Sequence, residues 1–427
     1  MTAGKTGGSP DTDQKAGLDP IAPGYKQTEI GVIPENWSIC RLSDVVQASR
    51  HIRYGVVQPG QYDAAGTFML RSQDYSKGWA GPDGMHRISP ALEKQYRNAR
   101  LAVRDLVMTV VGAGIGQVVV IPAWLDGCIP SRSTARVAID EEKAALQYVK
   151  TFLESSFGKR QIQDCQKEGA QPVVSCPDLG RFLLVKPPLP EQRAIAEALS
   201  DVDELLGALD RLITKKRDLK QAAMQQLLTA QTRLPGFHGE WTIKRLGEIC
   251  DLEMGRTPPR LNPAYWGRGY TWLSISDLQS KVVSSSKEQI TEAAAATMKP
   301  IPKGTLLMSF KLSIGRLCFA GCDLFTNEAI CSFNNLTANA DYLYYALSRV
   351  DFSLYGKQAV KGYTLNKETL NSVEVTLPPM PAEQTAIAEV LSEMDAELAA
   401  LEQRREKTRA LKQGMMQELL TGRTRLI

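Results

Sequence analysis

The sequence predicts an α+β protein built as an internal repeat, in which a globular domain is followed by a long helix and the combination then recurs. Two observations predict this. A helical segment beginning at Pro187 returns at Pro378, and after a one-residue insertion at Ala382 the two copies align without gaps to Leu234 and Leu426. The regions before the copies correspond more weakly, and each alternates short β-rich segments with helical ones.

The composition is that of a globular chain large enough for more than one domain. Of its 427 residues, 43% are hydrophobic and 23% are charged, and the formal net charge is only +4. So small an excess does not argue for nucleic-acid binding, and any DNA site must come from a local patch. No apolar run of about 18 residues predicts a transmembrane helix. Residues 1–24 lack the apolar core of a secretory signal and are expected to form a disordered tail. We therefore expect a cytoplasmic protein whose eight scattered cysteines are reduced.

The globular halves share a pattern of short strands and helices. Residues 37–42 (Trp-Ser-Ile-Cys-Arg-Leu) match residues 241–246, and Leu106-Val-Met-Thr matches Leu306-Leu-Met-Ser. The expected strands are 106–111, 118–121 and 134–139 in the first half, and 305–310, 317–320 and 329–333 in the second. Helical segments are expected at 146–157 and 342–354.

Each copy of the repeat has the pattern of a helix of about 40 residues that begins near a pair of prolines. Apolar residues recur at alternating spacings of four and three: Ile195, Leu199, Val202, Leu206, Leu209 and Ile213, then Ile387, Leu391, Met394, Leu398 and Leu401. This spacing predicts a narrow coiled-coil seam. Charged stretches at 215–217 and 404–407 interrupt the seams. The residues expected to resume them are Leu219, Met224, Leu227 and Leu228 in the first copy and Leu411, Met415, Leu419 and Leu420 in the second. We expect the two helices to pair; the alternative is two amphipathic helices on separate cores.

Loops between the expected strands combine Arg, Lys, Gln, Ser, Asn and aromatic residues. Examples are residues 71–77, 131–134, 310–316 and 361–364. Such side chains suit base edges and phosphates, although a single loop of this kind is more often simply solvated. Recurrence at equivalent places in both halves favours a binding function.

Several patterns resemble catalytic motifs without completing them. Gly112–Gly116 follows an apolar run, but a further strand is expected after it, where a phosphate-binding loop would need a helix. Asn262-Pro-Ala-Tyr265 is similar to the Asn/Asp-Pro-Pro-Tyr motif of adenine methyltransferases, yet Ala264 replaces the second proline and we expect a turn. Cys318 and Cys322 lack a second pair or a neighbouring histidine, so we expect no metal site and no catalytic residue.

The sequence resembles the specificity subunit of type I restriction–modification enzymes from about Tyr25 to the C-terminus. The resemblance is carried by residues 25–37, 272–277 and 306–315, and most specifically by Pro187-Pro-Leu-Pro-Glu-Gln192 with its copy at Pro378. It implies target-recognition domains at 25–186 and 233–377, separated by two conserved antiparallel helices at 187–232 and 378–427. Each domain would bind one half of a bipartite DNA target.

The resemblance also implies partners and excludes catalysis by this chain. Two modification subunits would dock to form an adenine-N6 methyltransferase, and two motor–nuclease subunits would join for restriction. S-adenosylmethionine, ATP and magnesium would belong to those partners. The expected DNA contacts are Arg71, Gln73, Lys77, Gln117, Arg132, Ser133, Gln171, Lys311, Ser313, Arg316, Asn327, Lys361, Tyr363 and Thr364. The expected subunit contacts are Glu191, Gln192, Ile195, Leu199, Leu227, Leu228, Glu383, Gln384, Ile387, Leu391, Leu419 and Leu420.

Other functions stay open at this point. One is a specificity subunit of a modification-only system, another is a coiled-coil scaffold without DNA affinity, and a third is a catalytic methyltransferase or nuclease. The base sequence of a target cannot be predicted from these residues, because base choice depends on loop geometry.

Overall fold

The computed structural model describes residues 22–79, 81–112, 114–165, 173–355, 357–359 and 362–426, with the backbone alone at 357–359 and 362–364. Most of the expected tail at 1–24 lies outside the described residues. The chain divides into two compact units, which we call unit 1 (residues 1–208 and 406–427) and unit 2 (residues 209–405). Each unit therefore contains one globular part and portions of both long helices.

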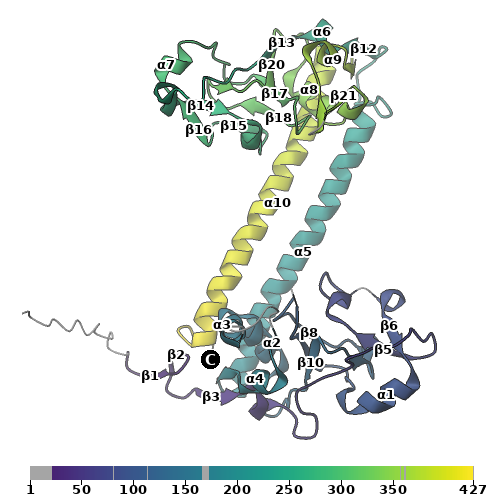
Figure 1. Cartoon of the computed structure of the whole chain (residues 1–427), viewed down its shortest axis with the longest axis vertical. Helices are drawn as coiled ribbons and strands as arrows, with labels where there is room; N and C mark the ends of the chain where they lie inside the picture. The colour runs from purple at the N-terminus through teal and green to yellow at the C-terminus, as the bar shows by residue number, and fades with distance from the viewer. Residues whose placement is uncertain are drawn as a thin grey trace, which may run out of the picture. The chain divides into compact units, whose positions relative to one another are not determined.

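The globular part of unit 1 contains two larger sheets, one of four strands and one of three (Figure 1). The first is antiparallel with the order β4-β10-β7-β8, and its strands are Arg53–Tyr54, Thr134–Val137, Leu106–Thr109 and Val118–Val120. The second has the order β6-β5-β9, with strands His86–Ile88, Thr67–Leu70 and Ile129–Pro130; β5 pairs antiparallel with β6 and parallel with β9. A two-stranded ladder joins β3 (Ser38–Arg41) to β11 (Leu183–Lys186), and a hairpin joins β1 (Tyr25–Thr28) to β2 (Gly31–Pro34). The helices are α1 (Pro90–Tyr96), α2 (Leu146–Glu154), α3 (Ser156–Cys165) and α4 (Cys176–Arg181).

Unit 2 repeats this topology with one additional strand at the edge of the larger sheet. The order β13-β20-β17-β18-β15 contains Asp251–Met254, Ile330–Asn334, Leu306–Ser309, Leu317–Ala320 and Val282–Val283. The order β16-β14-β19 contains Glu288–Ile290, Trp266–Leu273 and Phe325–Thr326, again with one antiparallel and one parallel pair. The ladder of β12 (Thr242–Arg245) and β23 (Glu374–Leu377) matches that of β3 and β11. The helices are α6 (Leu246–Ile249), α7 (Glu292–Ala295), α8 (Ala340–Leu347) and α9 (Lys367–Asn371), and a hairpin pairs β21 (Lys357–Ala359) with β22 (Gly362–Thr364).

The α+β class is confirmed, whereas two expected helices end early. The segment 146–157 divides into α2 and α3 at Ser155, whose backbone is extended (φ −71°, ψ 174°). The segment 342–354 ends as a helix at Leu347, and a separate 3-10 turn follows at Phe352–Leu354. Asp351 begins that turn because its carboxylate accepts the backbone N–H of Ser353 at 3.0 Å.

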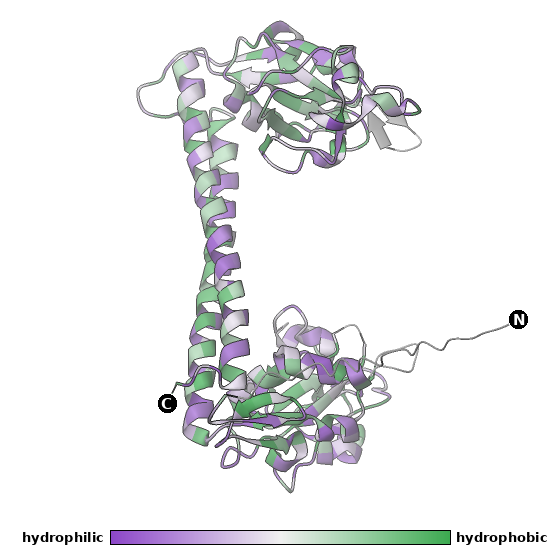
Figure 2. Cartoon of the chain, turned by 90° about the vertical axis from the view of Figure 1, so that its left-hand side faces the viewer, coloured by the Kyte–Doolittle hydropathy of each residue, from purple (hydrophilic) through white to green (hydrophobic). Residues whose placement is uncertain are grey.

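The core of each unit includes the ends of both long helices. In unit 1, Ile195 and Leu199 of one helix and Leu419 and Leu420 of the other pack into the same apolar cluster as the strands. In unit 2, Leu227, Leu228, Ile387 and Leu391 do the same. Figure 2 colours many of the strands as hydrophobic, and the central strands β7, β10 and β17 are buried at every residue. Burying a leucine contributes about 1.5–3 kcal/mol, so these positions fix the helices to the globular parts.

The two long helices are α5 (Leu189–Leu227, 39 residues) and α10 (Pro381–Thr421, 41 residues). Each is followed by a residue in the left-handed region, Ala230 (φ 57°) or Gly422 (φ 70°), as expected for a helix C-terminus. The charged stretches pair with the opposite helix within unit 2: Lys216 with Glu397 at 2.6 Å and Arg405 with Asp210 at 3.2 Å. Surface pairs of this kind contribute up to about 1 kcal/mol each. None of the described helices is long and apolar enough to cross a membrane.

The expected continuation of the seams is wrong at two positions. Leu219 is 46% exposed and Leu411 is 60% exposed, so neither lies between the helices. The other residues expected to resume the seams do lie inside, since Met224 and Met415 pack against the cores.

Thiol accessibility offers a test of this packing. All eight cysteines are free thiols, and burial raises the pKa of Cys128, Cys250, Cys318 and Cys331 to about 12. At pH 8 these four are therefore buried and protonated, and we expect a thiol-reactive probe to label at most the other four in the native protein. All eight should react after unfolding. Rapid native labelling of more than four would contradict the described cores.

Candidate functional site

A buried carboxylate begins each long helix and binds an arginine that follows the end of the other. In unit 2, Glu383 is completely buried and accepts two hydrogen bonds from Arg233, at 2.9 and 2.5 Å. In unit 1, Glu191 is 2% exposed and accepts from Arg425 and, at 2.9 Å, from the indole N–H of Trp37. The repeated Thr-Arg-Leu sequence after each helix therefore has a structural purpose, which is to close an antiparallel helix pair within each unit.

The glutamine beside each carboxylate fixes the helix to the globular part. Gln192 accepts the backbone N–H of Ala145 at 2.9 Å and donates to the carbonyl of Pro187 at 2.8 Å. Gln384 makes the equivalent bonds with Asn339 and Pro378, at 2.8 and 3.1 Å. The one-residue insertion at Ala382 leaves this arrangement intact. One difference remains: Trp241, the counterpart of Trp37, has a buried indole N–H without a partner among the described residues.

All twelve residues expected to contact partner subunits are buried within this chain. They are Glu191, Gln192, Ile195, Leu199, Leu227, Leu228, Glu383, Gln384, Ile387, Leu391, Leu419 and Leu420, each at most 7% exposed. The expectation of direct subunit contact needs correction, because these side chains are already occupied by the cores and by the Glu–Arg closures. Their repetition reflects the internal symmetry of the fold.

A different set of apolar side chains on α5 faces solvent. Leu205, Leu212 and Leu219 are 40%, 39% and 46% exposed and recur every seven residues. Seven residues are about two helical turns, so the three side chains lie along one stripe of the helix. Sequence reasoning missed this stripe because it assigned the apolar positions of the helix to one seam.

The expected DNA contacts of unit 1 converge on one group of loops. Residues 71–77 follow β5; the hydroxyl of Tyr75 hydrogen-bonds Thr109 at the end of β7 at 2.6 Å, and its carbonyl accepts the amide of Gln117 at 3.1 Å. Ser133 lies before β10, 2.9 Å from the hydroxyl of Ser131, whose backbone N–H donates to Leu70. Gln171 lies outside the described residues.

The side chains expected to contact DNA in unit 1 differ in whether their polar groups are free to bind a ligand. Arg71 donates to both carboxylate oxygens of Asp74 and to the carbonyl of Gly84, so its guanidinium is already engaged in shaping the turn. Gln117 is likewise used to position the loop. Gln73, Lys77 and Arg132 are exposed. The exposed three are therefore suited to contact a ligand directly, whereas Arg71 and Gln117 hold the loops in place.

The expected contacts of unit 2 lie at the equivalent loops. Ser313 and Arg316 belong to the turn between β17 and β18, where the backbone N–H of Arg316 donates to the Ser309 hydroxyl at 3.1 Å. The Lys311 ammonium lies 5.4 Å from the ring centroid of Phe310. Asn327 caps its own turn by accepting the N–H of Ala329 at 3.1 Å.

The remaining three contacts expected in unit 2 are described incompletely. Lys361 lies outside the described residues. Of Tyr363 and Thr364 only the backbone is described, in β22, and the next residue, Leu365, donates its N–H to the Phe310 carbonyl. That bond places the β21–β22 hairpin beside the Lys311 loop.

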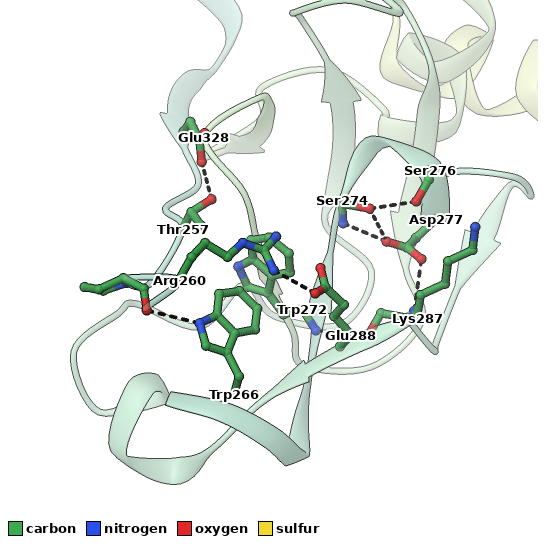
Figure 3. A network of polar contacts seen from close by, with 12 residues as sticks. Thr257, Arg260, Trp266, Trp272, Ser274, Ser276, Asp277, Lys287, Glu288 and Glu328 are labelled. Atoms are coloured by element: carbon green, nitrogen blue, oxygen red, sulfur yellow. Dashed lines mark hydrogen bonds and ion pairs between the residues drawn. The ribbon is translucent and has the colours of Figure 1, made fainter. Parts of the chain in front are cut away.

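A network that sequence reasoning missed lies on the three-stranded sheet of unit 2 (Figure 3). The Arg260 guanidinium lies 4.1 Å from the ring centroid of Trp266 and 5.0 Å from that of Trp272, and it donates to Glu288 at 2.7 Å. Nearby, Thr257 donates to Glu328; this bond lowers the pKa of Glu328, and the charges of Lys311 and Arg260 lower it further. The basic and aromatic residues from 256 to 272 could have signalled this site.

The motifs that resemble catalytic sites form turns. Gly112 (φ 96°) and Gly116 (φ 90°) shape the connection from β7 to β8, so a strand follows them, as expected. Asn262 accepts the N–H of Ala264 at 3.1 Å and begins a 3-10 turn at Pro263–Tyr265, which confirms the expected turn. Among the described residues, no group of three His, Cys, Asp or Glu side chains is placed to hold a metal ion.

The fold and these loops define a duplicated protein: two α+β domains of one topology, with polar and basic loops at equivalent positions and a closed antiparallel helix pair in each unit. Residues 238–410 match the family model described as type I restriction modification DNA specificity domain. A Methanocaldococcus jannaschii protein provisionally named the specificity subunit of type I restriction enzyme MjaX is 22% identical over 94% of this chain and 97% of its own.

Solved structures agree on the fold. The S subunit of a type I restriction–modification system from M. genitalium superposes with a TM-score of 0.57 at 14% identity, covering 90% of this chain and 96% of its own. A chain from a study of complex assembly and conformational transition of the type I R-M system gives a TM-score of 0.55 at 19% identity, covering 91% and 99%. Over most of its length the chain described here is similar to type I restriction–modification specificity subunits.

Proposed function

We propose that this chain gives a type I restriction–modification enzyme its DNA sequence specificity, each unit binding one half of a bipartite target. The observation that carries the proposal is the repetition of one sheet topology with different loop residues at equivalent places. Asp74 and Asp277 show it most directly: each accepts the N–H three residues earlier, at 2.8 Å, and so shapes the same turn after β5 or β14. The residues inside the two turns differ, which suits one scaffold to two base sequences.

Catalysis and cofactors are assigned to partner subunits under this proposal. Modification subunits would contribute S-adenosylmethionine chemistry at adenine N6, and motor–nuclease subunits would contribute ATP and magnesium. A modification-only complex would differ only in lacking the motor–nuclease subunits. The proposed place of action is the cytoplasm, where the target DNA lies.

The long helices are proposed to set the distance between the two half-sites. A continuous helix of 39 residues is about 58 Å long at about 1.5 Å per residue. At about 3.4 Å per base pair, this length corresponds to roughly 17 pairs. Because each domain covers part of that length, the unread gap would be markedly shorter.

Removing two exposed cations tests the DNA interface of unit 1. In Lys77→Ala/Arg132→Ala, loss of two phosphate contacts should weaken duplex binding, and the slope of log K against log salt should become less steep by about 1.8. Fluorescence anisotropy with a labelled duplex at several salt concentrations measures both quantities. Arg181→Gln is the matched control, because its side chain is 69% exposed in the same unit and belongs to neither loop. A double variant with the wild-type slope would remove these two residues from the interface.

The exposed leucine stripe is the proposed docking surface for the modification subunit. Leu205→Ser/Leu212→Ser/Leu219→Ser should keep its stability, at about 0.5 kcal/mol or less per site, because these side chains already face solvent. Its co-purification with the cognate modification subunit should fall at least tenfold. Leu354→Ser is the control, since Leu354 is 80% exposed but far along the chain from α5. Unchanged assembly by the triple variant would place the docking surface elsewhere.

A further inference from the structure

Five arginines of unit 1 line one cavity of about 770 Å³, and its lining contains none of the expected DNA contacts that the structure describes. They are Arg50, Arg53, Arg97, Arg100 and Arg136, and the lining also contains His51 and a single carboxylate, Asp126. The residues come from distant parts of the sequence, so the cluster is a product of the fold.

Neighbouring carboxylates neutralise only two of the five guanidinium groups. Arg50 pairs with Asp105 at 2.5 Å, and Arg100 pairs with Glu93. Among the residues that the structure describes, Arg53, Arg97 and Arg136 form no ion pair with a carboxylate. The cavity therefore has a concentrated positive charge, because Asp126 is the one carboxylate in its lining and Asp105, whose charge also acts on Arg136, is already paired with Arg50.

Arg136 is the most unusual of the set. It is only 3% exposed, and its guanidinium donates to the carbonyls of Arg100 at 2.8 Å and His51 at 3.1 Å. Its Nε–H is buried without a partner in the described part of the chain. Burial lowers the pKa of Arg136, and the charges of Arg50 and Arg53 lower it further, whereas the charge of Asp105 opposes this shift. A buried cation whose direct hydrogen-bond partners are neutral carbonyls is costly unless enough negative charge lies nearby.

The strand register places two of these cations next to each other. Arg53 on β4 lies directly opposite Arg136 on β10. Arg97 belongs to the 3-10 turn Arg97–Ala99. A second hollow of about 380 Å³ shares Arg97 and Arg100 and adds Lys94 together with Glu93, the carboxylate that pairs with Arg100. The positive surface thus continues from the buried Arg136 outward through exposed side chains.

We propose that this cavity is an oxyanion site that binds a phosphate group. Planar guanidinium groups match phosphate oxygens with paired hydrogen bonds, and the exposed guanidinium groups of Arg53 and Arg97 are available to such a ligand. A DNA backbone phosphate and the phosphate of a small molecule share this chemistry. The site is separate from the loops proposed to bind bases, so sequence-specific recognition does not depend on it.

Isothermal titration calorimetry of the full chain with inorganic phosphate, in a chloride buffer of low ionic strength, tests the site. The wild type should give saturable binding at millimolar concentrations. Arg53→Gln/Arg97→Gln should bind at least tenfold more weakly, whereas Arg160→Gln, an exposed arginine of α3 outside the cavity, should stay within twofold. Arg53 and Arg97 are exposed, so the double variant should melt at the wild-type temperature.

Duplex binding by the same variants identifies the source of the phosphate. If the double variant also binds DNA at least tenfold more weakly and inorganic phosphate competes with DNA, the site takes a backbone phosphate. If DNA affinity is unchanged while phosphate binding is lost, the site takes a free phosphate compound. Titration heats for the wild type that equal those of the double variant would overturn the proposal. DNA recognition by the base-reading loops would stand in that case.

Discussion

Inserting four residues into each long helix is expected to lengthen the gap between the two half-sites by one or two base pairs and to leave both half-site sequences unchanged. The insertions belong after Ala208 in α5 and after Arg405 in α10, where the two units meet in the sequence. Four residues add about 6 Å of helix, and a base pair rises about 3.4 Å. The half-sites should persist because every recognition loop is untouched.

The helical repeat makes four residues the appropriate length. At about 3.6 residues per turn, four residues advance the helix by a little more than one turn, so the buried faces stay nearly aligned. Mapping of methylated adenines after co-expression with the modification subunit measures the gap. A four-residue insertion after Gly60, in an exposed loop of unit 1, is the control and should change nothing. An unchanged gap in the helix variant would contradict the proposed spacing role.

Leu391→Ala is expected to lower the free energy of unfolding of unit 2 by about 2–5 kcal/mol, because it opens a cavity where α10 joins the core. Leu391 is completely buried among the residues of that core, with Ile387 and Leu227 nearby in the same cluster. Hydrogen exchange resolved along the chain is the suitable measurement, since a protein of two units need not unfold in one step. Faster exchange should be confined to unit 2.

The matched control is Leu212→Ala, on the other long helix but 39% exposed, for which a change below about 0.5 kcal/mol is expected. The comparison also separates two roles for Leu391. If Leu391 were a contact for a partner subunit, its alanine variant would be as stable as the wild type and would fail only in assembly. Equal effects of the two substitutions on unit 2 would contradict the assignment of Leu391 to the core.

The repeat in the sequence was enough to predict most of the fold. The recurrence of Pro187–Leu234 at Pro378–Leu426 required two equivalent helices, and matched β-rich segments such as 106–109 and 306–309 required two equivalent sheets. Local patterns also identified the turns at Gly112–Gly116 and Asn262–Tyr265. These features depend on short-range backbone chemistry, which a single sequence displays directly.

The roles of individual helix residues could not be predicted in the same way. Repetition marked Glu191 and Glu383, but it could not distinguish an internal contact from a contact with another subunit; only the position of Arg425 and Arg233 after the opposite helix decides this. Leu219 was misplaced because a heptad pattern defines a period without saying which stripe faces the partner helix.

The missed sites depend on tertiary structure. Arg260 becomes part of a network only when β14 carries Trp266 and Trp272 beneath it. The residues that line the arginine cavity are spread between 49 and 136, so no short segment of the sequence contains them together. The residues of both sites come close together only when the sheets pack, and the periodicity of a sequence does not reveal that packing.

The most direct test of two independent recognition domains is a hybrid in which residues 238–377 are replaced by the matching segment of a type I specificity subunit with a different target. Methylated adenines mapped after co-expression with the modification subunit should then show one half-site unchanged, the other replaced, and the same gap between them. A hybrid that folds and methylates DNA while both half-sites change together, or while neither changes, would contradict the account.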